Sequence, residues 1–302
     1  MKCTLMPYKS RSILTIQEAK QNAGWQVANF DLPNAWTYSE GNDVKIAVID
    51  SGCDLEHPDL IENLLPGINL INKRKPPADD CGHGTAVAGI ICASNNNIGI
   101  VGCAPKSKII PVKVLDSDGN GTLECVSKGV RWATDNGADL LCMSLGAPTK
   151  LQNIRKAIQY AQSKNVVTFV AAGNAGDKNQ IYYPANYPEC ISIGSVDRNS
   201  QIAKFSNLSD NLDFLAPGVE ILSTSPNNWY SVVNGTSFSA PWVCSIAALL
   251  LSYVRKTNTD IQLKTADDYR RLLKRYCINK NGKNTFSGFG LMNPNEFIQS
   301  FK

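Results

Sequence analysis

Short apolar runs alternate with longer helix-like segments along most of this 302-residue chain. Runs typical of buried strands cover residues 44–49, 108–114, 139–143, 166–171 and 190–193. Helices are expected over residues 83–93, 123–136, 151–164 and 237–255. Strands that alternate with helices in this way form βαβ units, whose strands run parallel and whose helices cover the sheet. The sequence therefore predicts an α/β fold of three layers, with a mostly parallel central sheet and helices on both faces.

The rest of the chain indicates one folded domain with an extension in front of it. Residues 265–276 are amphipathic, residues 286–294 are Gly-rich and loop-like, and we find no repeat, low-complexity tract or interdomain linker. A chain with 43% apolar and 19% charged residues can bury a sizeable core, which excludes a disordered or collagen-like protein. We therefore expect an N-terminal extension over 1–20 and a single domain over 21–302.

Charge and cysteine use indicate a cytoplasmic protein without nucleic-acid or membrane partners. The 30 basic and 26 acidic residues are dispersed, whereas a nucleic-acid partner would need a basic stripe. An apolar run such as 246–251 is shorter than a bilayer span, and residues 1–10 contain no apolar signal segment. Four of the ten cysteines lie within apolar runs, where a thiol behaves as a small core residue: Cys92, Cys142, Cys190 and Cys244. Reduced thiols and a cytoplasmic location are therefore expected.

Three segments place a reactive residue at the end of an expected strand or the start of an expected helix. Asp50 ends the strand in AVIDSG, His83 opens the helix in CGHGTAVAG, and Ser237 opens the helix in NGTSFSAP. A serine hydroxyl is a poor nucleophile at neutral pH unless an imidazole takes its proton and a carboxylate fixes the imidazole tautomer. The three residues supply these roles and indicate nucleophilic acyl transfer.

The same chemistry needs groups that stabilise the negative charge of a tetrahedral intermediate. A helix that begins at Ser237 leaves backbone N–H groups unpaired at its N-terminus, and these suit a developing oxyanion. Asn174 ends the run VAAGN after the expected strand over 166–171, and its side-chain amide is a second candidate donor. Glycines beside His83 and Ser237 allow substrate and backbone to approach closely.

The order Asp, His, Ser in these contexts resembles the subtilisin-like serine proteases, and the start Leu-Met-Pro-Tyr at 5–8 resembles the bacterial intracellular members. The resemblance implies a subtilisin-like fold over nearly the whole chain. It implies a serine endopeptidase that hydrolyses peptide bonds in proteins through an acyl-enzyme. It assigns Asp50 as the orienting carboxylate and His83 as the general base. It assigns Ser237 as the nucleophile and Asn174 as the oxyanion donor. Subtilisin is itself a standard example of this triad and of a side-chain oxyanion donor.

The resemblance also implies residues that bind the substrate. Two segments of the family hold a substrate peptide as an added strand, and their counterparts here include Gly119 and the run Ser144, Leu145 and Gly146. Tyr182 falls where the family often has a small residue at the base of the main specificity pocket. We therefore expect that pocket to favour small or medium side chains over large aromatic ones. Phe238 and Trp242 replace the usual Met and His, either on the leaving-group side or in helix packing.

The loop SNNNIGI resembles the calcium loop of the family, with Asp59 as its acidic partner. Carboxylate, amide and carbonyl oxygens are the ligands that Ca²⁺ prefers. The resemblance therefore implies a structural calcium ion held by Asp59 and by Ser94, Asn96, Ile98 and Ile100. An Asn- and Gly-rich loop is also ordinary turn chemistry, and that alternative stays open.

The N-terminal extension is expected to inhibit the enzyme in cis, because a cytoplasmic endopeptidase would otherwise threaten its own cell. About twenty extended residues reach roughly 65 Å, so residues 1–20 can cross the cleft, where residues 5–8 would add as a strand. Pro7 lacks an N–H and fixes φ, which would misplace the neighbouring carbonyl from the nucleophile. Cleavage within 12–21 by a second molecule would activate the enzyme. A packed or disordered arm is the alternative.

Simpler roles stay open for several residues. Ser237 could serve only as a helix cap, Asn174 could serve only as a turn residue, and Asp54 could replace Asp50. His57 precedes a proline, which favours a structural role over a catalytic one.

Three further alternatives concern the chain as a whole. Cys53 and Cys81 lie near the expected catalytic residues and suggest a metal site or a redox switch, although their spacing suits neither. A pseudoenzyme that only binds peptides would keep the cleft without the chemistry. A homodimer is also left open by the sequence.

Overall fold

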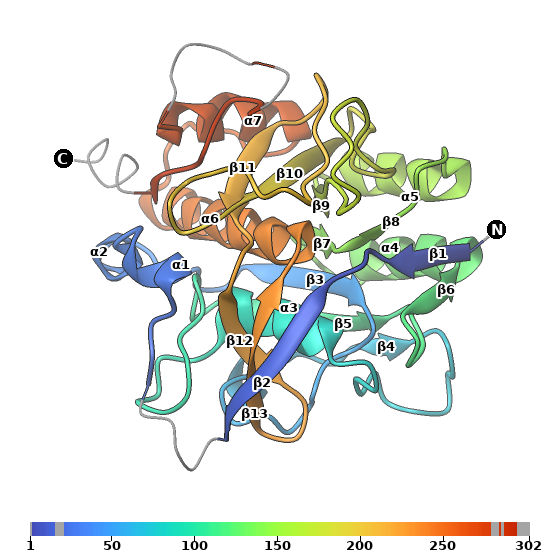
Figure 1. Ribbon diagram of the computed structural model, residues 1–302, viewed down its shortest axis with the longest axis horizontal. Helices are drawn as coiled ribbons and strands as arrows, with labels where there is room; N and C mark the ends of the chain where they lie inside the picture. The colour runs from blue at the N-terminus through green and yellow to red at the C-terminus, as the bar shows by residue number, and fades with distance from the viewer. Residues whose placement is uncertain (1, 16–20, 279–283, 285–286, 295–302) are drawn as a thin grey trace.

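The computed structural model describes residues 2–15, 21–278, 284 and 287–294. Its centre is a seven-stranded sheet in the order β11-β10-β9-β7-β3-β5-β4, and every neighbouring pair is parallel (Figure 1). The strands are β3 (Lys45–Asp50), β4 (Ile68–Asn69), β5 (Lys108–Lys113), β7 (Leu140–Met143), β9 (Val167–Ala171), β10 (Cys190–Val196) and β11 (Phe214–Pro217). The parallel sheet predicted from the sequence is confirmed.

Helices cover both faces of this sheet and form the outer layers. Helices α4 (Leu123–Asp135) and α5 (Gln152–Ser163) pack against each other, with α4 on β3 and β5 and α5 on β9. Helices α3 (His83–Cys92) and α6 (Thr236–Thr257) form the other layer (Figure 1). Shorter helices are α1 (Trp25–Ala28), α2 (Leu32–Trp36) and α7 (Ala266–Leu273). The predicted three-layer arrangement is thus confirmed.

The C-terminal part of the chain follows the sequence pattern. The amphipathic stretch forms α7 and a 3₁₀ turn over Lys274–Tyr276, and a second 3₁₀ turn lies at Ile61–Asn63. Residues 287–294 form turns and isolated bridges, as the Gly-rich sequence suggests, and residue 286 lies outside the described part of the chain.

Helix α6 runs through the core of the domain. Its 22 residues are long and apolar enough to span a membrane, but 89% of its most apolar window is buried inside the protein. The apolar run over 246–251 is shorter than the helix, because the helix also contains buried serines on the N-terminal side of that run. The Ser245 hydroxyl donates to the Pro241 carbonyl at 2.7 Å, which satisfies a polar group that the core would otherwise leave unpaired. We therefore describe α6 as the core helix of the domain.

Two N-terminal strands pair with segments outside the central sheet. Strand β1 (Lys2–Leu5) lies between β6 (Asn120–Thr122) and β8 (Leu145–Gly146) and is antiparallel to both. Strand β2 (Lys9–Thr15) adds antiparallel to β13 (Trp229–Asn234), whose other neighbour is β12 (Ile221–Ser225). In Figure 1 these blue strands run across the front of the domain, where β2 passes in front of α3.

This arrangement corrects two expectations about the extension. The sequence predicts one added strand over 5–8, but only Leu5 is paired, and Met6, Pro7 and Tyr8 connect β1 to β2. Pro7 has no N–H to donate to a ladder, which ends the strand at this point. Residues 12, 14 and 15 of the expected linker are paired with β13, and residues 16–20 lie outside the described residues.

Candidate active site

Asp50 and His83 form a buried pair where a strand and a helix meet. Asp50 is the last residue of β3, His83 is the first residue of α3, and both are fully buried. Nδ1 of His83 lies 2.8 Å from Oδ1 of Asp50, which also accepts the Ser51 N–H at 2.7 Å. A carboxylate that accepts the Nδ1–H leaves Nε2 as the proton acceptor of the ring. The two residues therefore have the relative orientation that a general base requires.

Asp79 holds the start of α3 against the end of β3. Its carboxylate accepts the N–H groups of Cys81, Gly82 and Thr85 and the Thr85 hydroxyl at distances between 2.6 and 3.0 Å. The Ser51 hydroxyl donates to the same carboxylate at 2.8 Å. Burial alone would raise the pKa of Asp79, but these hydrogen bonds outweigh burial and lower it. Sequence analysis missed this residue, although an acidic residue just before a helix N-terminus is a usable signal.

A buried lysine supports the segment that follows β3. Lys113 ends β5 and is the register partner of Asp50 in the sheet. Its ammonium donates to the carbonyls of Ser51 at 2.6 Å and Leu115 at 2.9 Å, and to the Asp80 carboxylate at 2.6 Å. A buried ammonium needs such a full set of acceptors. These bonds fix the backbone next to the Asp50–His83 pair.

Ser237 lies in the first turn of α6 and is fully buried. Its hydroxyl donates to the Ser144 carbonyl at 3.3 Å, and the Ser144 hydroxyl donates to the Ser237 carbonyl at 2.7 Å. His83 Nε2 has no hydrogen-bond partner among the described residues. The bond from nucleophile to base is therefore not formed in this state. Such bonds are often long or absent until a substrate is in place.

Asn174 has its side-chain amide fixed by a neighbour of the candidate nucleophile. Its Oδ1 accepts the Thr236 N–H at 2.8 Å and the Thr236 hydroxyl at 2.7 Å. These two donors assign the oxygen of the amide and direct Nδ2 to the opposite side. Nδ2 donates to the Pro7 carbonyl at 2.9 Å. The candidate oxyanion donor thus already binds a peptide carbonyl, and Thr236 is an orienting residue that sequence analysis missed.

The N-terminal segment occupies the cleft formed by these groups. The Leu5 N–H donates to the Gly119 carbonyl at 2.9 Å, and Leu5 pairs with Leu145 across β8. The Tyr8 ring lies edge-on to His83 at 4.8 Å and to Phe238 at 5.7 Å between ring centroids. Gly119, Leu145 and Gly146, which are expected to hold a substrate strand, therefore hold the chain's own N-terminus.

Met6 fills the space beside Tyr182. Met6 is 2% exposed, and its sulfur lies 3.8 Å from the Thr236 hydroxyl oxygen. A methyl group at Gly146 would meet Cε of Met6 at 2.9 Å and Cβ of Tyr182 at 3.5 Å. A methyl group at Gly173 would meet Cγ of Tyr182 at 3.1 Å. Tyr182, expected at the base of the main specificity pocket, and Gly146, expected to hold the substrate strand, therefore lie near the same unbranched apolar side chain.

The residues expected to bind calcium also lie together. One Asp59 carboxylate oxygen accepts the Asn96 amide at 3.1 Å, and the other accepts the Ile100 N–H at 2.9 Å and the Tyr230 hydroxyl at 2.9 Å. The Ile98 N–H donates to Asn96 Oδ1 at 3.1 Å. The loop thus brings one carboxylate, one side-chain amide and several backbone carbonyls to one place, which is the kind of donor set that Ca²⁺ takes.

Gln21 joins this group and was missed by sequence analysis. Its amide donates to the carbonyls of Ser94 at 2.9 Å and Ile100 at 3.5 Å. Amide orientations follow from the hydrogen bonds around them, so a bound cation would turn the oxygens of Gln21 and Asn96 toward itself. A glutamine far from the loop in sequence gives no signal of this role.

His57 and Asp54, for which sequence analysis left a catalytic role open, form hydrogen bonds with other groups. His57 is buried, its Nδ1 accepts the Asp59 N–H at 3.2 Å, and burial lowers its pKa. The Asp54 carboxylate accepts the N–H groups of Glu56 at 3.0 Å and Asn227 at 2.9 Å. Neither residue contacts His83 in the way that Asp50 does.

The cysteines give no sign of pairing. All ten are free thiols, and burial raises the pKa of Cys53 and Cys81. Within the described residues no group of three or more His, Cys, Asp or Glu side chains is arranged to hold a metal ion.

Trp242 is buried, and its indole N–H donates to the Gln26 carbonyl at 2.8 Å, so it serves helix packing. Phe238 instead faces Tyr8 and His83.

Comparison with known proteins identifies relatives of the chain. Subtilisin E of Bacillus subtilis (strain 168) is 44% identical over 216 residues, which make up 70% of this chain and 56% of that protein. This chain therefore spans little more than half the length of that relative. Thermitase of Thermoactinomyces vulgaris is 36% identical over 268 residues, or 88% of this chain and 92% of thermitase. The major intracellular serine protease of Bacillus subtilis (strain 168) is 35% identical over 282 residues, or 90% and 87%.

The sequence model of the subtilase family matches residues 41–290. This region contains the four candidate catalytic residues and the calcium loop, whereas β1 and β2 precede it. Because the match covers most of the 302 residues and agrees with the fold, the chain belongs to the subtilase family.

Proposed function

We propose that this subtilase is a serine endopeptidase that hydrolyses peptide bonds in proteins and peptides through an acyl-enzyme on Ser237. His83 takes the proton of the Ser237 hydroxyl and later gives it to the leaving amine, while Asp50 holds the imidazole in place. The Asn174 amide and backbone N–H groups at the start of α6 stabilise the oxyanion. The observation that carries the proposal is the buried Asp50–His83 pair together with an Asn174 amide that binds a peptide carbonyl.

Turnover requires the Ser237 hydroxyl to leave the Ser144 carbonyl and donate to His83 Nε2. Rotation about the side-chain χ1 bond would exchange one acceptor for another. His83 Nε2 is buried and without a partner among the described residues, so the new bond would satisfy an atom that is costly to leave unpaired. The exchange of the Ser144 carbonyl for His83 Nε2 supports a site that has all of its catalytic residues but is held in a resting state.

Replacing Asn174 with alanine is expected to lower kcat by about two to three orders of magnitude, because one oxyanion donor is lost. KM should change little, since the donor acts mainly on the transition state. Steady-state rates on a chromogenic peptide measure both constants. Asn179→Ala, on the loop that follows, is the matched control. An Asn174→Ala enzyme with the kcat of the parent would remove this residue from the mechanism.

We also propose that residues 1–20 inhibit the enzyme in cis and that the catalytic domain occupies 21–302. Strand β1 takes the position of a substrate strand, and the Pro7 carbonyl occupies the Asn174 amide that would otherwise bind the oxyanion. Pro7 would misplace the neighbouring carbonyl from the nucleophile. The contact of its own carbonyl with Asn174 also supports inhibition by occupancy, with Ser237 turned toward Ser144. Activation would follow from cleavage of the segment before Gln21 by a second molecule.

The proposed location is the cytoplasm. The similarity to a major intracellular serine protease supports it, and so do ten thiols without a disulfide. An endopeptidase in that compartment would need the restraint that the extension provides. Protein and peptide chains are the proposed substrates.

We further propose that a calcium ion stabilises the loop through Asp59, Asn96 and the carbonyls of Ser94, Ile98 and Ile100. Gln21 would supply a sixth oxygen once its amide is turned. When bound, the ion would act on stability and not on the chemistry of the triad.

Calcium is expected to raise the thermal midpoint of unfolding. A ligand that binds only the folded state adds about 2.7 kcal/mol at a hundredfold excess over its Kd, which for a chain of this size is a shift of about 5 °C. Thermal melts with calcium and with excess chelator measure the shift. Asp59→Asn should abolish it, while Asp197→Asn should keep it. Equal midpoints in verified metal-free and calcium-loaded protein would argue against the site.

Tyr182 is expected to limit the main specificity pocket to small or medium side chains. A phenol ring takes up volume that a small residue would leave open, and Met6 already fits beside it. Cleavage of peptides that differ only in Phe, Ala or Val before the cleaved bond measures this preference. Tyr182→Gly should gain activity on the Phe peptide by about tenfold. A strong preference for Phe that Tyr182→Gly leaves unchanged would contradict the assignment.

A further inference from the structure

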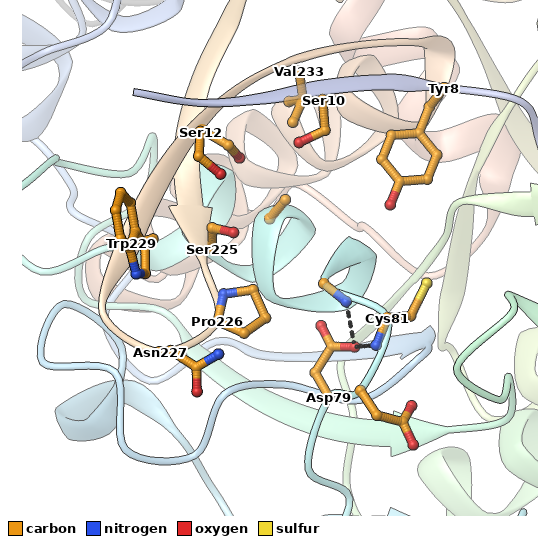
Figure 2. A pocket seen from close by; sticks show the side chains of 14 residues that line it. Tyr8, Ser10, Ser12, Asp79, Cys81, Ser225, Pro226, Asn227, Trp229 and Val233 are labelled. Carbon is orange, nitrogen blue, oxygen red and sulfur yellow. Dashed lines mark hydrogen bonds between the residues drawn. The ribbon is translucent and has the colours of Figure 1, made fainter. Parts of the chain in front are cut away.

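Asp79 has no part in the proposed chemistry, yet its carboxylate is bonded to both segments that carry the catalytic pair. One of its oxygens accepts the Ser51 hydroxyl and the N–H groups of Cys81 and Gly82. The other oxygen accepts the N–H and the hydroxyl of Thr85. Figure 2 shows Asp79 next to Cys81, with its hydrogen bonds to the backbone there drawn as dashed lines. All of these donors lie within two residues of the catalytic aspartate or histidine in the sequence.

The first turn of α3 depends on these bonds because its own cap residue is a glycine. That residue has a φ of 93° and forms no side-chain cap. The N–H groups at the start of a helix have no partner within the helix. Asp79 accepts the Thr85 N–H at 2.8 Å, and the Ser51 hydroxyl accepts the Gly84 N–H at 3.0 Å. The orientation of His83, the first residue of the helix, therefore follows from acceptors that lie outside the helix.

Ser51 connects Asp79 to the carboxylate of the catalytic pair. Its hydroxyl donates to Asp79 at 2.8 Å, and its backbone N–H donates to Oδ1 of Asp50 at 2.7 Å. Nδ1 of His83 lies 2.8 Å from the same Oδ1, while Oδ2 of Asp50 is buried without a hydrogen-bond partner among the described residues. Within that part of the chain, the Asp50 carboxylate is thus held by Ser51 and His83 alone. A shift of Ser51 would therefore turn this carboxylate away from the imidazole.

Asp79 also places a negative charge beside the pair. Its hydrogen bonds outweigh burial and lower its pKa, so the carboxylate is ionised at neutral pH. The titratable groups around the imidazole and its carboxylate come from β3, β5, the segment before α3 and the N-terminal segment: Asp50, Lys113, Asp79, Cys81 and Tyr8.

Two of these groups carry no charge at neutral pH, because burial raises the pKa of Tyr8 and of Cys81. The positive charge of Lys113 is offset by its ion pair with Asp80. The side chains that α6 and β12 place against His83 or its helix are uncharged: Phe238, Ser223 and Thr224. Asp79 therefore adds to the negative charge that Asp50 presents to the imidazole.

We propose that Asp79 is a positioning residue of the catalytic site. Through Ser51 and the first turn of α3 it sets the contact between Asp50 and His83. Its charge favours the protonated imidazole, which forms when the ring takes the proton of the nucleophilic serine. This inference rests on the proposed endopeptidase function and adds a residue that acts through its neighbours without touching the substrate.

Asp79→Asn tests the positioning and the charge together. Asp79 lines a surface cavity of about 440 Å³ beneath β2, so solvent can reach the changed side chain and we expect the variant to fold. An amide cannot replace both acceptor oxygens, and because a misplacement of about 1 Å can cost about a hundredfold, kcat is expected to fall by about that factor with little change in KM. The acid limb of kcat/KM should move to lower pH by about half a unit, because a negative charge that favours the protonated imidazole is lost.

Steady-state rates on a chromogenic peptide over a range of pH measure these effects. Each full-length variant is first processed by immobilised parent enzyme, which is then removed, so that a slow variant does not have to activate itself.

Ser51→Ala separates the hydrogen bond from the charge. It removes the hydroxyl that joins Asp79 to Gly84 and leaves Asp79 ionised, so kcat should fall about tenfold while the acid limb stays in place. A proton NMR spectrum of the full-length resting protein adds a measurement that needs no turnover. The Nδ1 proton of His83 resonates far downfield while its bond to Asp50 is short, and both variants should shift or broaden that signal.

Asp268→Asn is the matched control. Asp268 also accepts N–H groups at the start of a helix, in the capping box of α7, and its hydrogen bonds also lower its pKa. Its replacement should lower the thermal midpoint of unfolding and leave kcat, the acid limb and the downfield proton unchanged.

The outcomes distinguish this inference from the proposal on which it rests. A parent enzyme that cleaves no peptide would overturn both. With an active parent, a kcat of Asp79→Asn that equals that of the parent, or a fall that Asp268→Asn matches at the same loss of thermal midpoint, would overturn the positioning role and leave the endopeptidase intact. An unmoved acid limb in Asp79→Asn would overturn the effect of its charge. If Asp79→Asn does not fold, Ser51→Ala decides, and a parental kcat with an unshifted downfield proton would overturn the inference.

Discussion

Replacing Ser237 with alanine is expected to remove peptide hydrolysis almost completely. The change deletes the oxygen that forms the acyl-enzyme, and neither His83 nor Asn174 can replace it. The expected fall in kcat is about six orders of magnitude, the loss known for the same change in subtilisin, a relative of this chain. The remaining rate over water would come from the oxyanion donors and from substrate binding.

Initial rates on a casein-type substrate and labelling by a fluorophosphonate probe measure this effect. Ser163→Ala removes an exposed serine at the end of α5 and serves as the matched control. The parent protein should be labelled on Ser237 after activation, and Ser237→Ala should not be labelled. Turnover near that of the parent in Ser237→Ala would mean that the mechanism is wrong, and a parent that is never labelled would favour a peptide-binding pseudoenzyme.

Loss of the N-terminal segment is expected to raise activity by about a hundredfold. A cleft occupied by β1 and Met6 is open to substrate only in a minor state, and a minor state populated at about 1% limits the rate by that fraction. A chain that begins at Gln21 should therefore be far more active than freshly made full-length protein. Met6→Asp in the full chain should have a similar effect, because Met6 is 2% exposed and burial of a carboxylate there is costly.

Lys9→Ala, at an exposed position of the same segment, is the control for Met6→Asp. A second measurement follows trimming: full-length Ser237→Ala protein, treated with a trace of active enzyme, should lose its extension. If the chain from Gln21 is no more active than fresh full-length protein, and the extension is never trimmed, the inhibitory role is wrong.

The central sheet could be predicted from the sequence because its strands are buried on both faces. Strands β3 and β9 are mostly apolar runs, and their observed bounds differ from the expected ones by one residue at each end of β3 and by one residue at the start of β9. Strands β2 and β13 gave no such signal. The sequence KSRSILT of β2 is polar at the start, and its pairing with β13 joins segments more than 200 residues apart. Such pairing is decided by long-range contacts that no local pattern records.

The four candidate catalytic residues were found because each lies in a distinctive local string at a strand or helix end. Gln21, Asp79 and Thr236 were not found, since each acts through partners that only the fold brings near. Thr236 matters because its two donated bonds orient the Asn174 amide. The resting position of the Ser237 hydroxyl also lay beyond sequence reasoning, because it depends on the Ser144 carbonyl.

Strands β1 and β2 belong to the same polypeptide as the cleft that they occupy, so dilution cannot lower their local concentration there. A single break between Thr15 and Gln21 would leave the described contacts of β1 and β2 in place. It would nevertheless turn binding of the segment to the cleft from an intramolecular step into a bimolecular one. The segment would become a separate peptide, retained according to its own dissociation constant and free to escape into the surrounding volume. The same cut molecule would thus stay closed in a concentrated sample and open in a dilute one.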